Sequence, residues 1–331
     1  MRDSLNNKCR LFIENRDVFK AAFPWENSNF YPVCASVFMN CDKVADVESL
    51  KEVRRILKSR VNAFSNFRGN CELPIVAMLN ADPDPEWRLD KAIELYKSLK
   101  EHFFSSEYLP IAALILSGAV AQDKYAEVSE RTRAIYDLMK KEHPFLTSSE
   151  DSVFAAMLAL SPMTNEQIVA ETEACYNILK EKFFRGNHLQ SLSHVLALCD
   201  DDMRTASDKC RDAARLFDVL KEKKLKYGTG YELATLGTLA TLPYGVEAVA
   251  NDISEVYGFL KTQRGYGFFG FDRVSTLLHA AMIVSSDHVG GSDAMLGAAV
   301  GSTVSMIAAQ QAAMCAAMAA SAAASSAASR S

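Results

Sequence analysis

The residues of this chain best suited to acid–base chemistry are histidines and carboxylates in its second half. They are His194, Glu232, Asp272, His279 and His288. Because His194 and His279 occupy nearly equivalent places in two apolar segments, one face of the fold is expected to gather them with the carboxylates. Such groups act as general acids and bases in enzymes. The alternative interpretation is that each histidine is a hydrogen-bonded core residue, and no fixed spacing decides between the two.

A second candidate is the stretch QRGYGFFGFDR at 263–273, which combines glycines with aromatic residues. A loop carried by a rigid scaffold is a common place for binding residues. With two tyrosines from the preceding segment, the candidate binding residues are Tyr227, Tyr231, Tyr266, Phe268, Phe269, Phe271 and Arg273. The alternative is an enlarged form of a hydrophobic turn that recurs throughout the chain.

Motifs with a defined mechanism are missing from the sequence. It has no H-E-x-x-H pair, phosphate-binding glycine loop, calcium loop or G-x-S-x-G elbow, and its eight cysteines form no C-x-x-C pair. We therefore expect no metal site and no cofactor. Scattered thiols suit a reducing compartment, and the first residues contain no apolar signal core. These features predict a cytoplasmic protein.

The elements that must position these residues are marked by a ten-residue segment that recurs along the chain. It begins as AIELYKSLKE at 92–101, and its aromatic residue returns at steps of 40, 40, 41 and 40 residues. These aromatics are Tyr96, Tyr136, Tyr176, Phe217 and Tyr257. A lysine follows each one four residues later. A fixed period of this length predicts stacked supersecondary units.

Each repeat combines a short apolar segment, such as PIAALIL at 110–116, with a charged amphipathic one. A helix that is apolar all round must be enclosed, whereas a striped helix can face water. The sequence therefore predicts an all-α fold with an inner and an outer layer of helices. The predicted architecture is a right-handed α/α superhelix of helical hairpins, either open or closed into an α/α toroid. The aromatics are expected to pack between repeats and the lysines to end the outer helices.

The predicted organisation is one folded unit with three parts. An N-terminal helix occupies 1–30, six to seven helix pairs occupy 31–290, and an uncharged Ala-rich helix with a frayed tail occupies 291–331. The repeat boundaries are placed at 31–65, 66–103, 104–143, 144–183, 184–225, 226–264 and 265–290.

Charge and composition limit the partners that the sequence predicts. A net charge of −5 argues against a nucleic-acid surface. The Ala-rich segment is long enough to cross a bilayer but contains few of the Leu, Ile, Phe and Val residues that drive insertion, so a membrane partner is not expected. Its small residues favour close helix packing, which points to a homo-oligomer as one possibility.

Four stretches together resemble an uncharacterised bacterial family of unknown function. They are FPWEN, the repeated Y-x-x-L-K-E units, YELATLGTLATLP and IAAQQAAMCAAMAASAAASS. The resemblance implies a complete, all-helical, intracellular bacterial protein of about this length, with no assigned ligand or activity. The pattern favours a binding scaffold for a protein, peptide or small ligand over an enzyme. The alternatives are an enzyme with its site at one mouth of a toroid, and a structural protein that self-assembles through the Ala-rich tail.

Overall fold

The computed structural model describes residues 1–199, 204–267 and 270–289. Over these residues it contains fourteen α-helices and two short 3₁₀ turns, and no strand. The predicted all-α fold class is therefore confirmed. Phe268, Phe269 and the Ala-rich segment at 291–331 lie outside the described residues.

The chain forms two compact units. Among the described residues, unit 1 contains 1–13 and those between 170 and 289, and unit 2 contains residues 14–169. The two boundaries fall inside helices, namely α1 (Asp3–Ala22) and α9 (Asn165–Leu179). A unit boundary therefore does not coincide with a loop.

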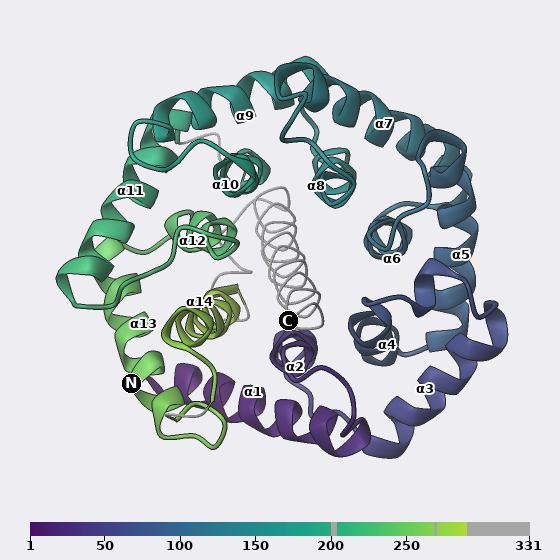
Figure 1. Cartoon of the computed structure of the whole chain (residues 1–331), viewed down its shortest axis with the longest axis horizontal. Coiled ribbons are helices and arrows are strands. Elements are labelled where there is room, and N and C mark those ends of the chain that lie inside the picture. The colour runs from purple at the N-terminus through teal and green to yellow at the C-terminus, as the bar shows by residue number, and fades with distance from the viewer. Residues whose placement is uncertain (200–203, 268–269, 290–331) are drawn as a thin grey trace, which may run out of the picture. The chain divides into compact units, whose positions relative to one another are not determined.

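Unit 2 alternates short and long helices. The short ones are α2 (Phe30–Asn40), α4 (Glu72–Ala81), α6 (Leu109–Ala119) and α8 (Asp151–Leu158). The long ones, besides the end of α1, are α3 (Val47–Arg60), α5 (Pro85–His102) and α7 (Tyr125–Glu142), with 3₁₀ turns at Asn66–Arg68 and Gln122–Lys124. Each short helix packs on the next short one and each long helix on the next long one. In Figure 1 the four short helices of this unit are seen end-on, beside the long ones.

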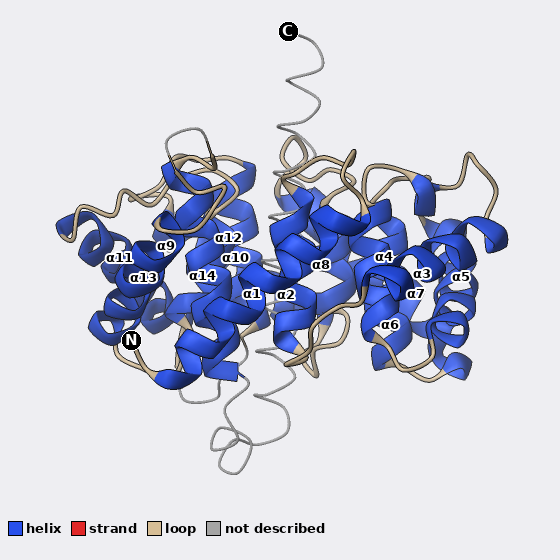
Figure 2. Ribbon diagram, turned by 90° about the horizontal axis from the view of Figure 1, so that it is seen from below, coloured by secondary structure: helices blue, strands red, loops and turns tan. Residues whose placement is uncertain are grey.

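Unit 1 repeats the same alternation. After the end of α9 come α10 (Asn187–Leu198), α11 (Ala206–Glu222), α12 (Leu233–Ala240), α13 (Val246–Lys261) and α14 (Arg273–Val289). Helix α12 packs between α10 and α14, and α11 packs on α13. Figure 2 shows these helices from the side.

Burial explains why the two helix types differ in sequence. In α6 every residue from Leu109 to Ser117 is buried, which requires the unbroken apolar run that the sequence has there. In α5 the buried residues are Leu89, Ala92, Leu95 and Leu99, at spacings of three and four. These spacings place one stripe on the buried side of a helix whose opposite side meets water.

Polar residues at the helix starts fix where the helices begin. Asp84 accepts a hydrogen bond from the backbone N–H of Trp87 at 3.0 Å, and Pro85 occupies the first turn, where a missing N–H costs nothing. Thr205 and Asp208 form a full capping box on α11. At α8, Asp151 Oδ2 accepts from the backbone N–H of Ser148 at 2.8 Å, which is one half of such a box.

The recurring aromatic packs against a second aromatic from the loop of the preceding repeat. Tyr96 meets Phe67 edge-on at 5.2 Å between ring centroids, and Tyr136 meets Phe103 at 5.3 Å. In unit 1, Phe217 meets Phe183 at 5.1 Å. Edge-to-face pairs of this kind add about 1 kcal/mol beyond their area burial.

The recurring lysine has a structural partner as well. Lys100 Nζ lies 5.9 Å from the centre of the Tyr96 ring, and Lys140 lies at the same distance from Tyr136. Lys261 lies 5.7 Å from the Tyr257 ring. A lysine four residues after an aromatic is one helical turn away, so these three lysines can reach the ring by a cation–π contact. Lys180 instead bonds Asn177, and the cation over the Phe217 ring is Lys182.

Candidate functional site

Three of the predicted site residues meet in one buried cluster of unit 1. The hydroxyl of Tyr266 lies 2.9 Å from His279 Nδ1, and the Phe271 ring stands at 89° to the imidazole, 4.9 Å away. Phe12, from the first helix, lies 5.9 Å from the same imidazole. His279 is 4% exposed. This environment orients the imidazole but presents little of it to a substrate.

Glu232 lies in the turn that precedes α12. Its Oε1 accepts a hydrogen bond from the backbone N–H of Gly230 at 2.7 Å. A Cβ placed on Gly228 would lie 1.7 Å from the same oxygen, so only glycine leaves room for this carboxylate. Nearby, the Tyr227 hydroxyl bonds Thr235, and burial raises the pKa of Tyr227. Glu232 therefore stabilises a tight turn.

The remaining predicted residues of this region have separate environments. Asp272 is exposed and caps α14, with Oδ1 accepting from the backbone N–H of Ser275 at 2.7 Å; Arg273 is exposed beside it. Tyr231 packs against the His188 ring at 4.5 Å, and His194 is buried within α10. The structure thus joins His279 to Tyr266 and Phe271, whereas Glu232 and Asp272 are each engaged in a turn of their own.

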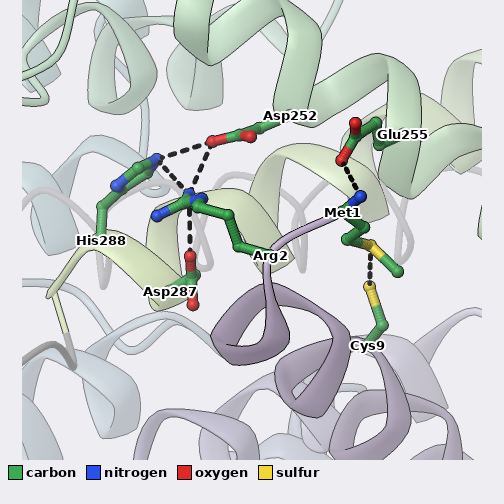
Figure 3. A network of polar contacts seen from close by, with 7 residues as sticks. All are labelled: Met1, Arg2, Cys9, Asp252, Glu255, Asp287 and His288. Carbon is green, nitrogen blue, oxygen red and sulfur yellow. Dashed lines mark hydrogen bonds and ion pairs between the residues drawn. The ribbon is translucent and has the colours of Figure 1, made fainter.

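His288 belongs to a different cluster, which Figure 3 shows. Its Nε2 lies 3.1 Å from Asp252 Oδ2 on α13 and 3.3 Å from Arg2 Nη2, and its ring stacks on Tyr244 at 4.2 Å. Arg2 also approaches Asp252 Oδ2 at 2.7 Å and Asp287 Oδ2 at 3.0 Å. The amino group of Met1 pairs with Glu255 at 3.0 Å. The polar cluster therefore joins the first residues of the chain to α13 and α14.

Electrostatics within this polar cluster favour ion pairing. Burial opposes ionisation of Asp252, but the hydrogen bond from His288 and the charge of Arg2 outweigh it and lower the pKa of Asp252. Burial and the negative charge of Asp287 raise the pKa of Cys9 to about 12, so this thiol is protonated and a poor nucleophile. The Asp287 side chain is 1% exposed, and its Oδ2 pairs with the Arg2 guanidinium at 3.0 Å.

The described residues contain neither a group of side chains suited to a metal ion nor a helix suited to cross a membrane. Within these ranges no group of three His, Cys, Asp or Glu side chains is placed to hold a metal ion. In the polar cluster, the Arg2 guanidinium supplies the positive charge between Asp252 and Asp287. None of the described helices is both long and apolar enough to span a bilayer.

A row of exposed aromatic side chains is the feature that sequence reasoning missed. Trp25, Phe64, Phe104 and Phe145 are 97%, 98%, 96% and 99% exposed. Each lies in a loop of unit 2 that leads from a long helix to the next short one. We call these four residues the tip aromatics, and their loops, residues 23–29, 61–71, 103–108 and 143–150, the edge loops. Phe184, 90% exposed, has the same position in unit 1.

Contacts between neighbouring repeats place the edge loops along one edge of unit 2. Glu26 of the first loop pairs with Arg54 near the end of α3, at 2.5 Å, and α3 leads into the second loop. Phe67 of the second loop packs on Tyr96 near the end of α5, which leads into the third. Phe103 of the third packs on Tyr136 near the end of α7, which leads into the fourth.

The tip aromatics could have been found from their spacing. They follow one another at 39, 40 and 41 residues, the period of the repeat itself. In the third edge loop two aromatics, Phe103 and Phe104, are adjacent. Phe103 comes seven residues after Tyr96 and is 9% exposed. Seven residues are about two helical turns, so Phe103 continues the buried stripe of α5, whereas Phe104 falls off it.

Comparisons with known proteins place the chain among relatives of unknown function. Residues 16–312 match the family described as "Protein of unknown function (DUF4003)". The chain is also similar to "Uncharacterized protein YeaA" of Bacillus subtilis (strain 168), with 23% identity over 202 residues. That alignment covers 59% of this chain, and the chain spans 61% of the relative's length. No solved structure matches the chain. The predicted resemblance to an uncharacterised bacterial family is thereby confirmed.

Proposed function

Since this chain belongs to the DUF4003 family, whose function is unknown, we propose that it is a helical-repeat binding scaffold. The observation that carries the proposal is the row of tip aromatics. A large apolar side chain left in water by folding gains about 2 kcal/mol when a partner buries it, and here four such side chains recur at the period of the repeat. We propose the edge loops as the binding surface.

We propose further that the helix pairs build a right-handed α/α superhelix that closes into a toroid. Support comes from unit 1, where the first turns of α1 pack on the last described helices through Met1, Arg2 and Phe12. A closed arrangement holds each edge loop against its neighbours, which limits the entropy lost on binding. Small-angle X-ray scattering tests the closure, because an open superhelix of the same length has a larger radius of gyration.

We also propose that the scaffold works in the cytoplasm. None of the seven cysteines among the described residues forms a disulfide, and six of them are buried. Several cysteines without disulfides are typical of proteins kept in a reducing compartment.

Photo-crosslinking inside cells tests the binding surface directly. The photoreactive analogue p-benzoylphenylalanine replaces Phe104, and in a matched control it replaces Trp87, an exposed aromatic at the start of α5. The eighteen-residue α5 separates the two positions by about 25 Å. We expect an adduct from position 104 and none from position 87. Equal yields at the two positions, or no adduct at position 104, would contradict the proposal.

A further inference from the structure

We propose that the tip aromatics insert into the headgroup region of a lipid bilayer, so that the partner of this scaffold is an anionic membrane surface. This inference rests on the proposed function and names the partner of the same edge. It concerns attachment to a membrane through loops, and is independent of the Ala-rich segment, for which the sequence predicted no membrane partner.

The isolation of the tip aromatics favours a bilayer over a protein partner. Each of the four is at least 96% exposed, so they neither touch one another closely nor form a shared apolar patch. A protein partner would need a separate pocket for each side chain, at the spacing of the repeats. The bilayer interface accepts every side chain independently, and aromatic residues concentrate at that depth.

The arrangement of the edge loops allows several tips to reach one surface together. Consecutive loops are linked by contacts with the next long helix, and Cβ of Glu107 lies 3.8 Å from the Cβ position of Gly69 in the neighbouring loop. Packed helices lie about 10 Å apart, so the four tips extend over roughly 30 Å. A membrane is a partner with a continuous apolar layer of that extent.

The residues around the tips suit the headgroup region. Ser105 and Ser149 are exposed in the same loops as Phe104 and Phe145 and can hydrogen-bond with lipid headgroups. Lysines in the last turns of the preceding helices can extend toward lipid phosphates while their stems cover apolar surface. These lysines are Lys20, Lys58, Lys100, Lys140 and Lys141.

Charge contributes less than aromatic insertion. Besides those lysines, the edge contains Arg60 and Arg68, but it also contains the glutamates Glu26, Glu101, Glu107, Glu142 and Glu150. Arg60 already pairs with Glu86 and Asp90, and Lys58 pairs with Glu72. The lysines in the last turns of α1, α5 and α7 therefore supply what attraction the edge has for an anionic surface. We therefore expect binding to neutral vesicles as well, more weakly.

The two tryptophans of the chain provide a matched pair of reporters. Trp25 is a tip aromatic, whereas Trp87 is 53% exposed at the start of α5. Trp87→Phe leaves Trp25 as the sole tryptophan, and Trp25→Phe leaves Trp87. Each full-length variant is mixed with vesicles of phosphatidylcholine, with or without phosphatidylglycerol. We expect the emission of Trp25 to shift to shorter wavelength and to be quenched by brominated lipid, and the emission of Trp87 to stay unchanged.

Co-sedimentation with the same vesicles gives the strength of binding. In the Trp87→Phe background, each serine substitution at Phe64, Phe104 or Phe145 should lower the partition constant about fivefold, as expected for one partly buried aromatic. Serine substitution at a loop residue exposed to water leaves the fold intact, and circular dichroism verifies this for each variant.

The vesicle and photo-crosslinking experiments together show whether only the lipid partner is wrong or the binding surface is wrong as well. Unchanged Trp25 emission with both vesicle types overturns the lipid inference, including the case in which the protein sediments through its Ala-rich segment. If a photoreactive residue at position 104 then yields a protein adduct, the binding edge stands and its partner is a protein. If it yields no adduct, both the inference and the proposed function fail.

Discussion

At the scale of single residues, Phe103 and Phe104 show how one position decides between burial and exposure. The two are neighbours of the same type, yet Phe103 is 9% exposed and Phe104 is 96% exposed. Phe103 packs on Tyr136, and the Arg133 guanidinium lies 5.4 Å from its ring centre. The sequence FF does not show which ring is buried until the stripe of α5 is extended past the end of the helix.

Asp151 is the residue whose charge opposes folding most clearly. It is 3% exposed at the start of α8, and burial raises its pKa to about 7, against the hydrogen bond from the backbone of Ser148. The folded state therefore holds the proton more tightly than the unfolded state. The contribution of Asp151 to the free energy of unfolding is therefore most favourable below its unfolded pKa near 4, and it decreases as the pH rises toward 7.

Asp151→Asn should remove this loss, because asparagine is neutral and its side-chain oxygen can still accept the N–H of Ser148. We expect the variant to match the native protein at pH 4 and to exceed it at pH 8 by up to about 4 kcal/mol in free energy of unfolding. Urea unfolding at a series of pH values measures this. A difference that stays constant with pH would contradict the assignment.

Asp208 provides a control, because folding lowers its pKa whereas folding raises the pKa of Asp151. Hydrogen bonds from Thr205 and Arg211 lower the pKa of Asp208. Its ionised form therefore stabilises α11, and this contribution is present above the unfolded pKa and disappears as the pH falls through the folded pKa. Asp208→Asn should reduce stability at neutral pH, and the reduction should vanish in acid.

At the scale of elements, the aromatic of each loop and the tyrosine of the next long helix form the joint between repeats. The distance between ring centroids and the edge-to-face geometry recur at Phe67 with Tyr96 and at Phe103 with Tyr136. The sequence predicted that the tyrosines pack between repeats. It interpreted the lysines only as helix-end residues, because a cation–π contact depends on a rotamer that spacing alone does not specify.

Phe103→Ala should weaken this joint. We expect a loss of about 3 kcal/mol in the free energy of unfolding, from lost apolar burial and the cavity left against Tyr136. Phe104→Ala should change stability by less than about 0.5 kcal/mol, since its ring contacts mainly water. Urea unfolding of both variants at pH 7 makes the comparison, and equal losses would mean that Phe104 also packs.

At the scale of the whole molecule, the sequence predicted the all-α class and the family, because a period of 40 residues and the stretches around it are long, redundant signals. The candidate site was harder to predict. Glu232 and Asp272 look like acid–base groups in the sequence, but each serves a local turn. The polar cluster depends on Arg2 meeting Asp252, 250 residues away, and a single sequence contains no signal for that pairing.

The edge loops also show what a single sequence can and cannot indicate about the exposure of a side chain. Their aromatics have the period of the repeat, and extending the buried stripe of α5 past its end separates Phe104 from the buried Phe103. No such signal marks Trp25, Phe64 or Phe145 as exposed. Exposure is decided by how each chain segment leaves its helix. We therefore infer that the tip aromatics serve binding and make no contribution to the stability of the fold.

The most direct test of that claim is the free energy of unfolding of a variant in which serine replaces Trp25, Phe64, Phe104 and Phe145 together. Far-ultraviolet circular dichroism follows its unfolding in urea, independently of tryptophan. We predict a value within about 1 kcal/mol of the native protein, since exposed positions lose no packing. A loss of about 6 kcal/mol or more, as four buried aromatics would produce, would contradict the account.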